Sequence, residues 1–186
     1  LAEENHQDVA EASPVLPLPA SVHSLIQYRI ERLSAPAHSY IQAAAILGNP
    51  FNARPAQVMQ GLNDEEAAAL LAELQNYQVI EPLPDLANIQ SYQFFHDKLA
   101  ESILAAMPAS LHSLLHKKAA QALESTRSID PERQAAVLAE HWQSGGEIVK
   151  AFEYWLRAAE NARHLFSLEQ AEQAFQQAER LYQTSA

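Results

Sequence analysis

Residues 78–99 read QVIEPLPDLANIQSYQFFHDKL, and this stretch decides the fold class. Two runs rich in β-branched, aromatic and other apolar residues, 78–83 and 89–95, are separated by a proline-containing turn, which is the pattern of a β-hairpin. His96 and Asp97 follow the second run directly, and a helical pattern begins there. The stretch therefore predicts two strands, a turn and the start of a helix.

Several helices are expected upstream of this hairpin. They span residues 21–33, 36–47, 54–60 and 64–76. Ser34 supplies an N-cap and Pro36 a first-turn proline for the second of them, and Gly61 ends the third. Asn63 or Asp64 caps the last helix, whose first turn is acidic and so suits the positive end of the helix dipole. The last three helices followed by a two-stranded wing are in the order of a winged helix.

Everything after Asp97 has a helical pattern. Helices are expected near residues 97–106, 109–125, 131–143, 147–164 and 167–184. In the last one Ala171, Phe175, Ala178 and Leu181 form a small-large-small-large ladder, which is typical of the second helix of a tetratricopeptide repeat. Trp155 precedes Ala171 by sixteen residues, where such a repeat places the tryptophan of its first helix. It is expected to be buried between the repeat helices, in contact with the ladder around Ala171 and Phe175. A plain amphipathic helical bundle is the alternative interpretation.

These patterns divide the chain into three parts within a mainly α fold. Residues 1–19 are acidic and then proline-rich, and are expected to be a flexible linker. Residues 20–108 are expected to form a winged-helix arm with a leading helix, and residues 109–186 a region of antiparallel, tetratricopeptide-like helical hairpins. The chain begins at Leu1 and is expected to be a piece of a longer protein.

Composition excludes several classes of function. The 186 residues carry a net charge of −11, which repels nucleic-acid backbones and anionic membranes. Cysteine is absent, which excludes disulfides and thiolate metal sites and fits a cytoplasmic location. No glycine precedes a Lys-Ser or Lys-Thr pair, so there is no phosphate-binding P-loop, and no apolar run is long enough to span a membrane. This segment alone is therefore not expected to hydrolyse a nucleotide.

A winged helix often binds DNA, but the charges argue against that function here. Residues 35–108 contain two basic residues, Arg54 and Lys98, against eight acidic ones. The third helix of the winged-helix unit, residues 64–76, has no lysine or arginine. Because groove binding needs several cations to neutralise phosphates, no direct contact with nucleic acid is expected.

Histidines are the remaining candidates for chemistry. His112 and His116 share one helix face, a spacing that can hold zinc, but no glutamate lies between them and two lysines follow. They are expected to be structural or exposed, and His141, beside Trp142, to be part of a packing edge. No metal site, Ser-His-Asp arrangement or pair of carboxylates can be argued from the spacing.

The order of parts resembles one class of signalling ATPases. The stretch 18–51 reads LPASVHSLIQYRIERLSAPAHSYIQAAAILGNPF. A Phe-x-His-Asp sequence follows it at residues 94–97, at the end of the expected wing. The matching positions are Leu18, Pro19, Ser21, Leu25, Ile26, Arg29, Ile30, Leu33, Ala44, Ala45, Leu47, Gly48 and Phe51. The pattern resembles the signal-transduction ATPases with numerous domains, the STAND class, which includes the bacterial maltose-regulon activator, plant disease-resistance proteins and animal apoptosome proteins.

The resemblance implies a regulatory arm without catalytic activity of its own. In that class the histidine at the junction of wing and helix reaches the ADP bound by an upstream ATPase domain, which also binds ATP and Mg²⁺. His96 and Asp97 match the His-Asp of the family motif, and Phe95 replaces its methionine. His96 would contact the ADP phosphate, and Asp97 would cap the helix or orient the imidazole. A protein or small-molecule inducer would bind the helical repeats.

Two other functions stay open at this point. The chain could be a stand-alone adaptor whose helical repeats bind a protein, with the winged helix as packing support. A DNA-binding winged helix is the third interpretation, and charge disfavours it.

Overall fold

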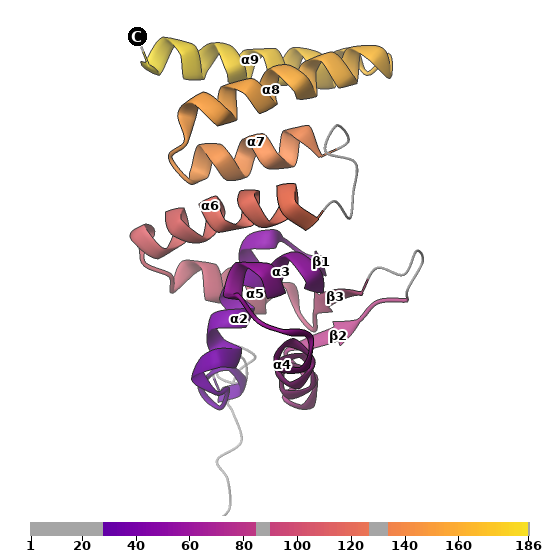
Figure 1. The fold of residues 1–186 in the computed structure, drawn as a ribbon, viewed down its shortest axis with the longest axis vertical. Coiled ribbons are helices and arrows are strands. Elements are labelled where there is room, and N and C mark those ends of the chain that lie inside the picture. Colours follow the sequence, from indigo (N-terminus) through magenta and orange to yellow (C-terminus); the bar gives the residue numbers. More distant parts are fainter. Residues whose placement is uncertain (1–27, 85–89, 127–133, 186) are drawn as a thin grey trace, which may run out of the picture.

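The computed structural model describes residues 28–84, 90–126 and 134–185, and is mainly α-helical with a small three-stranded antiparallel sheet (Figure 1). Its helices are α2 (Ala35–Leu47), α3 (Ala53–Gln60), α4 (Asp64–Asn76), α5 (Asp97–Ala105), α6 (Ala109–Thr126), α7 (Ala135–Ser144), α8 (Ile148–His164) and α9 (Leu168–Ser185). Its strands are β1 (Phe51–Asn52), β2 (Ile80–Pro82) and β3 (Ser91–Phe94). In Figure 1 the sheet and α2–α5 form one end of the molecule, and α6 to α9 are stacked above them.

Local sequence signals set the ends of the first helices, as predicted. The side chain of Ser34 accepts a hydrogen bond from the backbone N–H of Ala37 at 3.3 Å, and a proline occupies the first turn of α2. Gly61 ends α3 in the left-handed conformation, with φ at 66°. Asn63 and Glu66 form a capping box at the start of α4, each side chain accepting the other's backbone N–H at 2.9 Å. These three helix ends therefore lie at residues whose side chain or backbone conformation suits the position.

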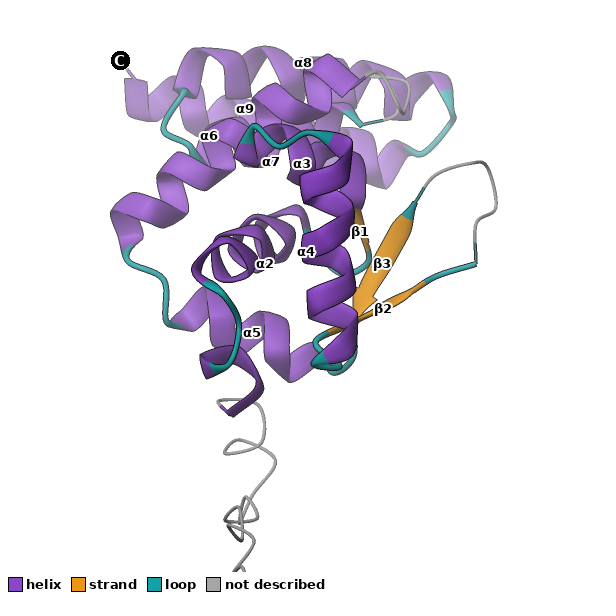
Figure 2. Ribbon diagram, turned by 60° about the horizontal axis from the view of Figure 1, so that its bottom comes forward, coloured by secondary structure: helices purple, strands orange, loops and turns teal. Residues whose placement is uncertain are grey.

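The sheet has one strand more than the predicted hairpin. β2 and β3 pair antiparallel, with Ile80 opposite Phe94, which confirms the hairpin. β1 pairs with the other edge of β3, so that the order is β1-β3-β2 and Phe51 lies opposite Tyr92. Two strands alone were expected, because β1 is only two residues long and its partner is distant in the chain. Figure 2 shows the sheet beside α4, at the edge of the helical unit.

Two hydrophobic cores hold the chain together, and α6 belongs to both. The first core is built around α2, where Tyr40 and Ile41 are fully buried, and it includes Leu115 of α6. The second core contains Trp142 and also takes in Ala120 of α6. Because α6 carries buried residues of both cores, it connects the end that holds the sheet to the C-terminal helices.

The C-terminal helices pack as antiparallel hairpins, α7 with α8 and α8 with α9 (Figure 1). Trp155 on α8 is 8% exposed, as predicted, and its Nε1–H donates to Gln143 Oε1 at 2.9 Å. Phe175, which was expected to contact Trp155, is 45% exposed and is not one of the residues of the second core. The buried side of α9 is formed by Ala171, Ala174, Ala178 and Leu181. Alanine at three of these positions lets α8 and α9 approach closely, while the side chain of Phe175 is partly exposed to solvent.

Some expectations fall on residues outside the described ranges. These are the linker at 1–19, most of the leading helix at 21–33, the tip of the hairpin at 85–89 and the start of the helix expected at 131. Of the leading helix, residues 28–31 are described and are helical. Across the described residues, no helix combines the length and the apolar character that crossing a membrane requires.

Candidate functional site

His96 occupies the connection between β3 and α5. Its backbone is extended, with φ at −142° and ψ at 136°, and it holds the N-cap position of α5. Its carbonyl accepts the N–H of Leu99 at 2.9 Å, but its side chain forms no capping hydrogen bond. The imidazole is exposed and meets the ring of Phe95 edge-on, with centroids 5.0 Å apart. An exposed imidazole at the electropositive end of a helix can donate to an anion.

Asp97 is the first residue of α5 rather than its N-cap. Its Oδ1 accepts a hydrogen bond from Asn49 Nδ2 at 2.8 Å, and Asn49 Oδ1 accepts the N–H of Phe94 at 3.0 Å. The amide of Asn49 therefore ties the end of β3 to the start of α5. Asp97 was expected to cap the helix or to orient the imidazole. In the structure His96 has the N-cap position, and no side chain caps the helix. The carboxylate still lies in the first turn, where the helix dipole favours a negative charge.

Arg29 lies beside the same junction, and sequence reasoning gave it no role. Its guanidinium carbon is 5.5 Å from the centroid of the Phe95 ring, so that Arg29 and His96 both contact one exposed phenylalanine. Arg29 also donates to the backbone oxygen of Gln78 at 2.9 Å and to its Oε1 at 3.1 Å. Gln78 has a positive φ of 52°, which is uncommon for a residue other than glycine. The arginine in the quoted 18–51 motif was the only signal for this contact.

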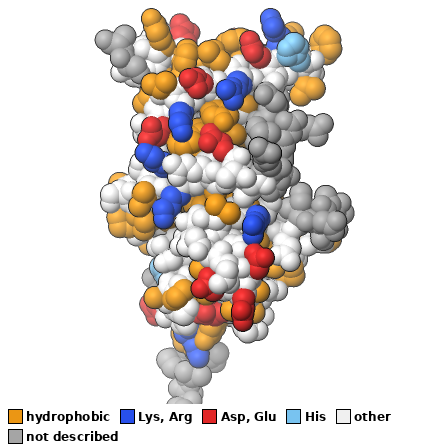
Figure 3. Space-filling model, viewed as in Figure 1, with side chains coloured by type: hydrophobic (Ala, Val, Ile, Leu, Met, Phe, Trp, Pro, Cys, Tyr) orange, Lys and Arg blue, Asp and Glu red, His pale blue; other side chains and the backbone are white. Residues whose placement is uncertain are grey.

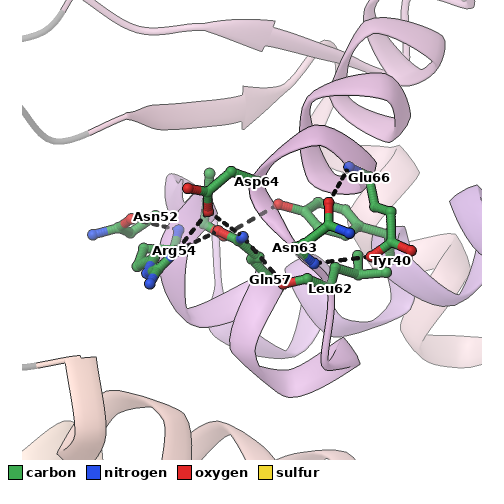
Figure 4. A network of polar contacts seen from close by, with 9 residues as sticks. Tyr40, Asn52, Arg54, Gln57, Leu62, Asn63, Asp64 and Glu66 are labelled. Carbon is green, nitrogen blue, oxygen red and sulfur yellow. Dashed lines mark hydrogen bonds and ion pairs between the residues drawn. The ribbon is translucent and has the colours of Figure 1, made fainter.

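A polar groove of about 680 Å³ lies between α3, α4 and β3. At its edge Arg54 pairs with Asp64 at 3.0 Å, and Gln57 Nε2 donates to the same carboxylate oxygen at 2.7 Å (Figure 4). These two partners, Gln57 first, lower the pKa of Asp64. The charge of Arg54 is thus balanced inside the groove. The arrangement offers hydrogen bonds but no surplus of positive charge.

Lys98, the second basic residue of the stretch 35–108, is also paired. Lys98 lies 2.6 Å from Glu101, one turn along α5. The first turn of α4 carries Asp64, Glu65 and Glu66. On the face shown in Figure 3, basic side chains are scattered singly among acidic ones rather than gathered in a patch. The basic side chains of residues 35–108 are therefore paired with carboxylates rather than gathered into a positive patch.

The structure brings together three histidines that were considered separately in the sequence. His112 and His116 lie side by side on α6 with ring centroids 4.6 Å apart and ring planes tilted by 53°, and His141 of α7 contacts His116. The proximity of His141 had no signal in the sequence. Among the described residues, no group of three or more histidine and acidic side chains is arranged to hold a metal ion.

Comparisons with known proteins give no family for this chain. No model of a protein family matches the sequence, and a search of curated proteins likewise found no match. The resemblance to the signalling ATPases therefore stays a prediction based on the motifs quoted above.

Proposed function

We propose that residues 20–108 form a winged-helix arm and that the helices after it begin a tetratricopeptide-like stack. The order α2-β1-α3-α4-β2-β3 supports the first assignment, because a winged helix alternates its three helices and three strands in this way. The buried Trp155 and the alanine side of α9 support the second, since small residues at a helix interface beside a large aromatic are typical of such repeats.

In this proposal the chain is a regulatory part of a larger STAND-class ATPase and has no catalytic activity of its own. The ATPase domain, upstream in the same chain, binds ATP or ADP with Mg²⁺. In the resting state it packs against the arm, and His96 donates to a phosphate of ADP. The observation that carries the proposal is the exposed imidazole of His96 at the N-cap of α5, with no capping hydrogen bond of its own. A donor at that place adds to the positive end of the helix dipole.

Asp97 has a supporting role in this scheme. The hydrogen bond from Asn49 fixes its carboxylate next to the histidine and ties β3 to α5. Movement of the wing and movement of α5 are thereby linked. Since α5 leads into α6, which belongs to both cores, a change at His96 has a structural path to the helical repeats.

The test is a titration of the full-length protein with ADP and ATP, together with an assay of its output. His96→Ala should weaken ADP relative to ATP by about 5- to 150-fold, the usual range of a coupling free energy, and should raise the basal output. His164→Ala is the matched control, because His164 is exposed at the end of α8, outside the proposed site. Unchanged ADP affinity and unchanged basal output in His96→Ala would rule out the nucleotide contact.

An adaptor that binds a protein or a small-molecule inducer on its helical repeats is the second candidate. A groove of about 410 Å³ between α7, α8 and α9 favours it. Trp155 borders this groove, and amide side chains such as Gln170 and Gln173 line it, which gives an apolar floor with hydrogen-bonding groups around it. If His96→Ala leaves nucleotide binding unchanged while Gln173→Trp, which fills the groove, abolishes the response to the inducer, the adaptor function is favoured.

We infer no contact with nucleic acid or membrane for this chain, and a cytoplasmic location. Charge supports the first point, since Arg54 and Lys98 are both paired with carboxylates. The net charge of −11 would also repel an anionic membrane surface. A DNA-binding winged helix is therefore the least favoured of the three functions.

A further inference from the structure

Three imidazoles, here called the histidine row, lie across the interface between α6 and α7. They are His112 and His116 on α6 and His141 on α7. The rings of His116 and His141 are 5.0 Å apart, and their Nδ1 atoms are separated by 2.9 Å. His141 is only 6% exposed, and His116 is partly buried. The proposed function makes no use of these residues.

The contact between the two Nδ1 atoms constrains the protons on both rings. A distance of 2.9 Å is that of a hydrogen bond, so one Nδ1 must carry a hydrogen and the other must accept it. Two neutral rings satisfy this only as opposite tautomers. One added proton leaves the bond intact but places a charge in a buried site. A second added proton makes both Nδ1 atoms donors, and the bond is lost.

The surroundings disfavour the charged form. Burial lowers the pKa of His141 to about 4, and burial with the charges of His141 and His112 lowers the pKa of His116 to about 4. Among the described residues of the helices packed around the row, the charged groups have other partners or face solvent, so they do not stabilise a protonated imidazole. Lys117 pairs with Glu147, Lys118 reaches the carbonyl of Met59, Arg54 pairs with Asp64, Lys150 lies over Trp142, Arg157 lies over Tyr154, and Glu124 accepts from Trp142 and Tyr154. Glu140, Glu153, Glu160, Arg163 and His164 are exposed, and α2 contributes His38 and the hydroxyl of Tyr40, which donates to Ala53.

The location of the histidine row gives it a structural role. Leu115 and Ala119 of α6 are buried in the first core, and Ala120 is buried in the second, so His116 lies where the two cores meet. We propose that the histidine row is an acid-sensitive latch, which holds α7 and the hairpins behind it on α6 while its rings are neutral and releases them when they take up protons.

The direction of the pH dependence follows from the pKa values. Both folded-state values, about 4, lie below the ordinary value of 6.5, so the unfolded or released form binds more protons between these limits. The stability that the latch supplies is complete above about pH 6.5 and is lost as the pH falls toward 4. With two histidines, the equilibrium constant for release should rise by up to about 100-fold per pH unit in this window.

The test compares urea unfolding at pH 7.5 and pH 5.0, with EDTA present to remove metal ions. Both tryptophans, Trp142 and Trp155, lie in the C-terminal hairpins, so their emission reports on that part while far-UV circular dichroism reports on the whole chain. The double variant His116→Asn with His141→Asn keeps an amide near each Nδ1 position but cannot titrate. His164→Asn, on an exposed histidine of α8, is the matched control.

In the wild type and in His164→Asn, the tryptophan transition should move to lower urea at pH 5.0 and should precede the transition seen by circular dichroism. In the double variant the shift between the two pH values should be much smaller. A shift as large in the double variant as in the wild type would overturn the proposal.

Nuclear magnetic resonance of the wild type tests the latch even if the double variant does not fold. Imidazole ¹⁵N shifts should show opposite tautomers for His116 and His141 at pH 7.5, and both rings should titrate well below pH 6. Equal tautomers, or titration of both rings near pH 6.5, would overturn the proposal. So would Zn²⁺ binding that abolishes the pH dependence, because the row would then be a metal site.

Discussion

Replacing Trp155 with alanine tests whether the C-terminal hairpins depend on one buried aromatic residue. The indole lies in the second core with Ala158, Ala174 and Ala178, and it donates a hydrogen bond of 2.9 Å to Gln143. Truncation removes the ring and that bond. Several residues of this core are alanines, whose short side chains can fill little of the space that the ring leaves.

The expected loss follows from burial. Truncating a buried phenylalanine or tryptophan costs about 3–5 kcal/mol, which includes the term for the cavity left behind. Two features place Trp155 near the lower limit. The indole borders the open groove of about 410 Å³, so water can enter part of the space, and alanine gains some helix propensity. We expect a loss of about 3 kcal/mol, which for a chain of this size lowers Tm by roughly 6–12 °C.

Urea titration followed by Trp142 emission and by circular dichroism measures this loss. Phe175→Ala is the matched control, because it truncates an aromatic residue on the facing helix α9 that is 45% exposed. Its cost should be about 1 kcal/mol, since about half of the side chain is already in water. If Phe175→Ala destabilises the chain as much as Trp155→Ala, the assignment of buried and exposed sides of α9 is wrong.

Two further substitutions test local features. Asn63→Ala breaks the capping box with Glu66 and should cost about 1 kcal/mol in urea unfolding, whereas Asn76→Ala, exposed at the other end of α4, should cost almost nothing. Gly145→Ala places a Cβ 3.0 Å from the backbone nitrogen of Lys117 and should cost about 1–3 kcal/mol, because the backbone of α6 cannot yield cheaply. Equal stability of the two asparagine variants would contradict the first, and wild-type stability of Gly145→Ala the second.

The parts of the fold that depend on neighbours in the chain could be predicted from the sequence. Ser34 and Asn63 cap their helices because their side chains reach backbone N–H groups three residues away. Gly61 ends α3 because its left-handed backbone costs glycine little. The β2–β3 hairpin follows from composition over a short stretch. In each case the deciding interaction spans a few residues.

Contacts between distant segments could not be predicted in this way. β1 exists only because Phe51 lies beside Tyr92, and nothing in its own two residues indicates a strand. Phe175 was expected to lie against Trp155, but it is 45% exposed, whereas Ala174 next to it is buried. A ladder that tolerates spacings of three and four leaves the rotation of a helix undetermined by about one residue. At the candidate site, His96 was found from its motif, while the hydrogen bond from Asn49 to Asp97 depends on the tertiary fold.

The contact between His116 and His141 follows from a close approach of two helices at a glycine. Gly145 ends α7, and its N–H donates to the carbonyl of His141 at 2.9 Å, one turn earlier. A Cβ on Gly145 would lie 3.1 Å from the Cα of Lys117, the residue that follows His116. The backbone φ of −78° is open to any residue, so the conformation does not require glycine here. Glycine is needed because a side chain would collide with the backbone of α6. The approach that the missing Cβ permits also brings the two imidazoles within hydrogen-bonding distance. Gly145→Ala should therefore weaken the His116–His141 bond. It should lower the stability of the chain and also reduce the pH dependence of unfolding.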